Sequence, residues 1–151
     1  ALDAALPLLR PALEPRMLQV LESPDETSIR KAVAAHALGR MGSTSAVPEL
    51  TVWAWSDDFQ VASWSANALG MIADPQAIPR LEELAFHPRP EIRWNAVQGL
   101  GRNTTDAAVG ALGRIVLGLP ADEDDLRPRA PTPAEGAAPQ QVRTAVDLLR
   151  G

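Results

Sequence analysis

The chain repeats itself every 31 residues across its central part, and this period limits the fold more than any other feature of the sequence. The pair Leu38-Gly39 recurs as Leu69-Gly70 and again as Leu100-Gly101. The same spacing relates Ala46, Ala77 and Ala108, then Val47, Ile78 and Val109, and also Leu50, Leu81 and Leu112. A period of this length is typical of stacked two-helix units, each too small to bury its apolar face alone.

The composition of the chain further limits which fold classes and which kinds of functional site are possible. Hydrophobic residues make up 46% of the 151-residue chain and aromatic residues only 4%, which favours helices over a β-sandwich or barrel. The formal net charge of −5 argues against a surface that binds nucleic acid, where basic side chains must meet phosphates. The chain contains no cysteine, so disulfides, thiolate nucleophiles and cysteine-based metal sites are excluded.

The sequence also bears on location. No apolar run reaches the length that a membrane span requires, and the first residues, Ala1-Leu2-Asp3, lack the basic start of a signal peptide. We therefore expect no membrane partner and a cytoplasmic location. Because the chain begins without methionine, we also expect it to be a fragment or a processed form. In either form, a signal peptide or an anchor can have been removed.

Helical spacing of apolar residues extends over most of the chain. In the middle unit, apolar or small residues recur at Val61, Ser65, Ala66, Ala68 and Leu69, which gives one buried face. The pattern predicts helices at residues 12–22, 26–41, 45–56, 59–72, 75–86, 90–102, 106–118 and 140–150. Residues 2–9 predict a further short helix.

One position of the period predicts helix caps. Ser43, Asp74 and Thr105 precede the second helix of the three units, and a short side-chain oxygen there accepts a backbone N–H that has no partner within the helix. Asp57-Asp58 predicts a cap for the helix that starts near Phe59, where the helix dipole favours a carboxylate.

The units resemble a known family of repeats. Residues 91–101, Glu-Ile-Arg-Trp-Asn-Ala-Val-Gln-Gly-Leu-Gly, resemble the short HEAT repeat of the phycobilin-lyase type, and residues 34–42 and 46–50 match it more closely. The resemblance covers about residues 28–118. It implies an all-α fold, namely a right-handed α-solenoid of stacked antiparallel helix pairs. Ala62 departs from the pattern, because the family carries an arginine after the aliphatic residue.

We expect a single solenoid domain over residues 1–151. Its repeats are about 28–57, 58–88 and 89–118, with degenerate flanking units at 1–27 and 140–151. Ala145-Val146 and Leu148-Leu149 match Ala96-Val97 and Gly99-Leu100 at an offset of 49 residues. The difference is an acidic, proline-rich stretch at 119–139, which predicts a loop insertion.

The resemblance implies that the second helices line the concave surface of the stack. Trp55 and Phe86 share a register there, just beyond the core positions, and tryptophan is common at binding hot spots. The alternative is that both rings seal the contact between repeats. The candidate partner-binding residues are the second-helix positions outside the core stripe: Glu49, Val52, Trp55, Arg80, Glu83, Phe86 and Arg114.

The other three tryptophans predict packing roles. Trp53 shares the register of Leu84 and Ile115, which predicts a core residue. Trp64 and Trp94 lie on first helices, and we expect both to pack against an adjacent repeat.

The sequence predicts no metal site, no cofactor and no catalytic residue. Neither His36 nor His87 has a second histidine three or four residues away, and His87 directly precedes a proline at a helix end, so we expect structural roles for both. The acidic run at 122–125 lacks the alternating ligands and the glycine of a calcium-binding loop.

These observations favour a non-catalytic module that binds another protein or a peptide. A bilin-lyase-like enzyme or chaperone subunit is one alternative, because bilin lyases share this type of repeat. The second alternative is a repair protein like the alkylpurine DNA glycosylases, suggested by Trp53, Trp55 and Asp57 and opposed by the negative net charge.

Overall fold

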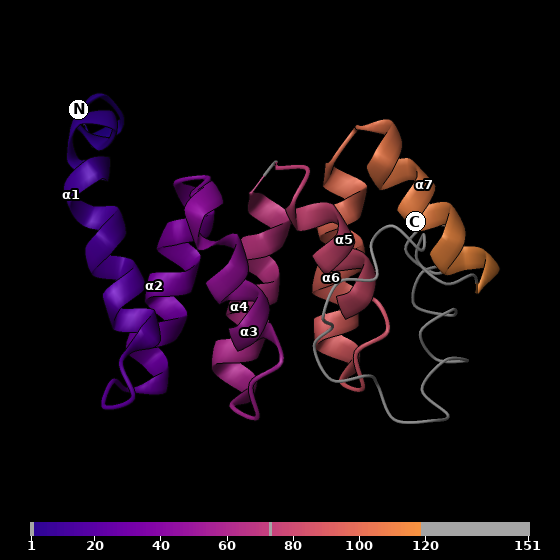
Figure 1. The fold of residues 1–151 in the computed structure, drawn as a ribbon, viewed down its shortest axis with the longest axis horizontal. Coiled ribbons are helices and arrows are strands. Elements are labelled where there is room, and N and C mark those ends of the chain that lie inside the picture. The colour runs from indigo at the N-terminus through magenta and orange to yellow at the C-terminus, as the bar shows by residue number, and fades with distance from the viewer. Residues whose placement is uncertain (1, 73, 119–151) are drawn as a thin grey trace.

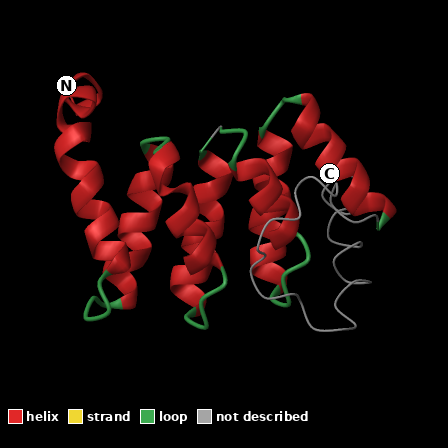
Figure 2. Cartoon of the chain, viewed as in Figure 1, coloured by secondary structure: helices red, strands yellow, loops and turns green. Residues whose placement is uncertain are grey.

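The computed structural model describes residues 2–72 and 74–118, with side chains from residue 8 onward, and these ranges contain helices and no strand (Figures 1 and 2). The helices are α1 (Leu2–Glu22), α2 (Ser28–Arg40), α3 (Val47–Ala54), α4 (Phe59–Met71), α5 (Ala77–Leu84), α6 (Pro90–Arg102) and α7 (Asp106–Leu117). A 3-10 helix, η1 (Thr44–Ala46), leads into α3. The helix predicted at 140–150 and the loop insertion predicted at 119–139 lie outside the described residues.

The helices form a row of helix pairs, and each pair consists of a first helix and a second helix. The first helices, α2, α4 and α6, lie side by side, and α1 packs against α2 at one end (Figure 1). The second helices, α3, α5 and α7, each follow a first helix, and α3 and α5 pack against the first helix of the next pair. This order of contacts confirms the prediction of a helical fold and reflects the period of the sequence.

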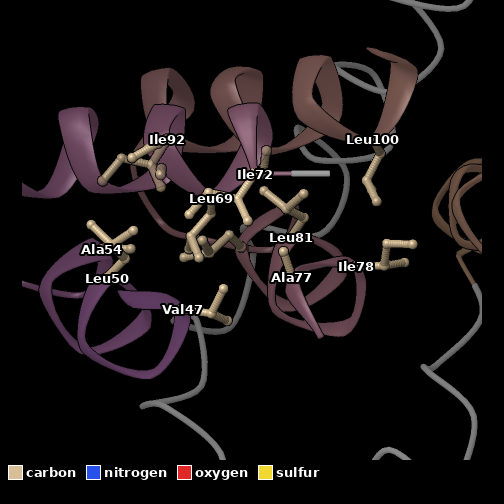
Figure 3. Close-up of a cluster of buried hydrophobic side chains, with 14 of the residues drawn as sticks. Val47, Leu50, Ala54, Leu69, Ile72, Ala77, Ile78, Leu81, Ile92 and Leu100 are labelled. Atoms are coloured by element: carbon tan, nitrogen blue, oxygen red, sulfur yellow. The ribbon is translucent and has the colours of Figure 1, made fainter. Parts of the chain in front are cut away.

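The core runs between the two kinds of helix. Figure 3 shows Leu50 of α3 and Leu81 of α5 beneath Leu69 of α4 and Leu100 of α6, and all four side chains are buried. Burying one such side chain contributes about 2 kcal/mol. Each of these residues lies 31 positions from its counterpart, so the hydrophobic stabilisation is spread evenly along the row.

Neighbouring first helices approach closely through small residues, and we call this contact the seam. A Cβ placed on Gly39 would stand 2.7 Å from the Ala68 Cα, and one placed on Gly70 would stand 2.7 Å from the Gly99 Cα. Real Cβ atoms do not approach backbone so closely, because close-packed interiors leave no such space. The glycine of the Leu-Gly pair therefore allows one first helix to pack directly against the next at Gly39 and Gly70.

Polar side chains join the same neighbours. Ten side-chain hydrogen bonds between distant positions of the described residues each span 29 to 33 residues. Ser28 donates to Asp58, which lowers the pKa of that carboxyl. Ser43 and Ser45 both donate to Glu14 and likewise lower its pKa. Each unit is thus held by its sequence neighbours, as in a one-dimensional array.

The N-terminal helix corrects one prediction. Residues 2–9 and 12–22 were expected to form two helices, but α1 is continuous from Leu2 to Glu22. Pro7, Pro11 and Pro15 are four residues apart, so the positions without an N–H lie on one side of the helix. Pro11 and Pro15 are exposed, and water can satisfy the carbonyls that lack a donor there.

The caps agree with the sequence in part. Thr105 Oγ1 accepts from the Ala108 N–H at 3.3 Å and caps α7 as expected. Asp74 does not cap α5, which corrects that prediction, because α5 begins only at Ala77 and the Asp74 Oδ1 accepts from the Gln76 N–H at 2.8 Å in the turn before the helix. Ser43 makes no cap, which corrects that prediction, because its hydroxyl donates to Glu14 of α1 instead. Asp58 caps α4 as expected.

Trp53 also differs from its prediction as a core residue. Its ring is half-buried and packs against the core. Lys31 Nζ lies 4.0 Å from the ring centroid, and the indole Nε1 donates to Glu49 at 2.7 Å. The indole N–H needs a polar partner, so the ring stays at the edge of the core with a cation over its face.

Gly70→Ala should destabilise the protein by about 1–3 kcal/mol, because the added methyl group collides with the Gly99 backbone. The loss should appear even though alanine is the better helix former by about 1 kcal/mol. Gly113→Ala in α7 is the matched control, since a Cβ there meets no described atom within 4 Å, and it should raise stability slightly. Urea unfolding followed by circular dichroism measures both, and equal effects would contradict a close-packed seam.

Candidate functional site

The residues expected to bind a partner lie on the second helices or in the turns directly after them (Figure 1). We call this set the second-helix surface: Glu49, Val52, Trp55, Arg80, Glu83, Phe86 and Arg114. Val52, in the middle of α3, is 66% exposed. The other six are half-buried. The set therefore combines one open apolar side chain with residues that also contribute to packing.

Trp55 is held by the neighbouring repeat. Its ring centroid lies 4.5 Å from that of His87, with an angle of 44° between the rings. Trp55 and Phe86 both pack against the core, and the Trp55 Nε1 is buried without an acceptor among the described residues. Trp55 thus seals the contact between α3 and the turn after α5. Substituting it changes stability as well as the surface.

His87 has a structural role at this contact, as the sequence led us to expect. It is buried, and its Nδ1 accepts from the Arg89 backbone N–H at 3.0 Å. Burial, followed by the charges of Arg89 and Arg93, lowers the pKa of His87 to about 4. The buried Arg93 donates to the carbonyls of His87 and Pro88 at 3.0 and 2.9 Å. At neutral pH the imidazole is therefore uncharged beside two cations.

The charged residues of the second-helix surface are paired with other protein groups. Arg114 donates from Nε and Nη2 to the two carboxylate oxygens of Glu82 at 2.7 and 2.8 Å. Glu82 is 1% exposed, so this pair joins α5 to α7 beneath the surface. Arg80 and Glu83 form an ion pair at 3.3 Å, and Glu49 accepts from Trp53 as described above. The Glu82–Arg114 pair thus joins neighbouring helices, whereas the other two pairs lie within α5 and within α3.

Two residues of this region were missed by reasoning from the sequence. Leu117 is 31 residues beyond Phe86 and shares the register of Trp55, yet it is 72% exposed. The period alone could have found it. Glu82 could not be found in this way, because nothing in the sequence distinguishes a buried glutamate from the half-buried Glu83 beside it.

The first helices carry the other aromatic residues. Trp64 on α4 meets His36 on α2 edge to face, with 4.9 Å between the ring centroids, which agrees with the expected packing against an adjacent repeat. Trp94 on α6 is 41% exposed.

Within residues 2–72 and 74–118, no three His, Asp or Glu side chains group so as to hold a metal ion. The acidic run at 122–125 lies outside these ranges. No helix in the described part of the chain has both the length and the apolar character needed to cross a bilayer.

Comparison with known families supports the geometry. The sequence model of the family described as HEAT repeats matches residues 54–136, more than half of the chain. The protein belongs to the HEAT-repeat family. HEAT repeats are generally protein-interaction or scaffold modules. No curated protein matches the chain.

The HEAT repeats should lose stability on mild acidification. The folded-state pKa of His87, about 4, lies below its ordinary value of 6.5, so the unfolded chain binds the proton first. The stability that depends on neutral His87 is complete above about pH 6.5 and is lost as the pH falls towards 4, amounting to about 3 kcal/mol. Urea unfolding across this range measures the loss, and His87→Gln should flatten the profile. Parallel profiles for the two proteins would contradict this role.

Arg114→Met should destabilise the HEAT repeats by about 3–5 kcal/mol, because it leaves the buried Glu82 carboxylate without a partner. Combining it with Glu82→Met should recover most of the loss, since no buried charge then remains. Thermal unfolding of wild type, the two single variants and the double variant measures the four stabilities of this double-mutant cycle. Additive losses would show that the two side chains do not depend on each other.

Proposed function

We propose that this HEAT-repeat protein is a non-catalytic interaction or scaffolding module, and that the second-helix surface binds another protein or a peptide. One observation carries the proposal: two of the three second helices, α3 and α7, each present a large apolar side chain to solvent. Val52 on α3 is 66% exposed, and Leu117 on α7 is 72% exposed in the register of Trp55 and Phe86. Apolar side chains gathered on one side of a fold are typical of interaction sites.

The pairing of charges supports the same function. Arg80 is paired with Glu83, and Arg114 is paired with the buried Glu82. Because these charges already have partners, a ligand gains mainly from apolar contact, with the half-buried pairs at the rim. Interfaces commonly have this arrangement, with a few apolar or aromatic anchors inside a polar rim.

We further propose that the repeats are of the short phycobilin-lyase type and stack as a right-handed superhelix, with the second helices on its concave side. The 31-residue period and the Leu-Gly pairs support this subtype. On this proposal the domain consists of repeats 28–57, 58–88 and 89–118 with flanking units at 1–27 and 140–151.

Val52→Glu should reduce partner binding about tenfold or more, because a charge then enters the apolar centre of the interface. Val52 tests the surface better than Trp55 does, since it is more exposed and its substitution changes stability by only about 0.5 kcal/mol. Immobilised wild-type and variant proteins are incubated with lysate of the native host, and the retained proteins are quantified by mass spectrometry.

Val33→Glu is the matched control for this experiment. Val33 is 62% exposed and lies on α2, a first helix, so the same charge is placed on a different surface. Proteins that bind the second-helix surface should be retained by wild type and Val33→Glu and lost with Val52→Glu. Equal retention by all three would refute the assignment of the surface.

A further inference from the structure

The side of α6 and α7 that faces away from the preceding repeats has the register of the internal seams. Ser63 on α4 accepts hydrogen bonds from Asn95 on α6 at 3.1 and 3.2 Å, so position 63 faces the following helix. Trp94 lies 31 residues later and faces the same way on α6. Positions 98 and 101 lie on the same side of α6, because they are four and seven residues after Trp94. We call this set the end face: Trp94, Gln98, Gly101 and Val109.

Two positions of the end face, Val109 and Gly101, are more exposed than their counterparts in the preceding repeats. Val109 is 60% exposed, whereas Val47 and Ile78 in the same register are 3% and 5% exposed. A Cβ on Gly101 would meet nothing within 4 Å in the part of the chain that the structure describes, whereas Gly70 lies against the next helix. Among the described residues, the end face is therefore half of a seam without its other half.

One position distinguishes the end face from the internal seams. Ala32 and Ser63 are small, which leaves room for the next first helix. Trp94 in the same register is large and 41% exposed. Trp94 and Gly101 are seven residues apart, about two helical turns, so they lie on the same side of α6. The end face thus carries a large ring at Trp94 and, about two turns further along the same side of α6, a glycine with no side chain at Gly101.

We propose that the end face pairs with the end face of a second copy of this chain. The two α6 helices lie antiparallel about a twofold axis that passes close to Gln98. In this arrangement the Trp94 ring lies over Gly101 of the second copy, and the reverse contact is identical. A ring fills the space above a glycine, so each copy supplies what the other lacks. The proposal does not rest on the function proposed above, because it uses a different surface.

The charges of α6 favour the antiparallel direction. Glu91 lies in the first turn and Arg102 in the last, and both are exposed. Antiparallel pairing brings each Glu91 towards Arg102 of the second copy and places helix dipoles of opposite direction side by side. Parallel pairing would align like charges.

Two other occupants fit the end face less well. Internal seams place a small residue such as Gly99 over the preceding glycine. The sequence of 140–151, which lies outside the described residues, carries Leu148 at the matching position. At the other end of the row stands α1, which exposes Leu8 and Leu9 beside Pro11 and Pro15 but contains no glycine. A head-to-tail contact would therefore give the Trp94 ring no glycine to lie over, whereas a closed dimer does.

Analytical ultracentrifugation of the full chain, from micromolar to near-millimolar concentration, tests the proposal. Wild type should approach twice the 16.1 kDa monomer mass. Trp94→Ser and Gly101→Leu should each raise the dimer dissociation constant about tenfold or more, the first by removing the ring and the second by filling the space above the glycine. Trp64→Ser, which removes a similarly exposed ring from α4, should leave the mass unchanged. Circular dichroism checks that each variant is folded.

A crosslink tests the geometry directly, because the natural chain has no cysteine. Gln98→Cys lies at the proposed axis and should form a covalent dimer on mild oxidation. Asn67→Cys, in the same register on α4, should not. A monomer at all concentrations would overturn the proposal, as would a dimer that Trp94→Ser and Gly101→Leu leave intact.

Discussion

The close approach of neighbouring first helices is the contact on which the rest of this structure depends. Gly39 lies on Ala68 and Gly70 lies on Gly99, at distances that admit no extra methyl group. Because the first helices can approach so closely, the leucines of the second helices reach the core between them (Figure 3). The spacing of the seam therefore sets the spacing of the second helices, and with it the spacing of whatever they present to solvent.

Polar interactions follow the same one-dimensional order. The long-range side-chain hydrogen bonds among the described residues connect positions about one period apart, and the buried Glu82–Arg114 pair does so between α5 and α7. An array held by nearest neighbours has two kinds of free surface: its sides, which recur in every unit, and its ends, where a neighbour is missing. The second-helix surface is of the first kind. Within the part of the chain that the structure describes, the end face is of the second kind.

The period and the helical character could be predicted from the sequence, because both follow from a spacing of apolar residues that recurs three times. Caps were less predictable. Ser43 occupies the cap position but donates to Glu14, since α1 brings a carboxylate within reach. The break expected between helices 2–9 and 12–22 is absent, because Pro11 and Pro15 are exposed on one side of α1. Such outcomes depend on what a neighbouring element contributes, and local sequence does not contain that information.

The sequence by itself determined the repeated unit and, Trp53 aside, which residues of the unit form its core, since apolar periodicity allows only one buried face per helix. Tertiary structure decided how residues of the same register differ in role. Val47, Ile78 and Val109 are equivalent in the period, but only Val109 is exposed. Trp55, half-buried against His87, and the exposed Leu117 differ in the same way. The physical reason is that exposure depends on whether a following unit covers the position, and a residue's own neighbours in sequence cannot specify that.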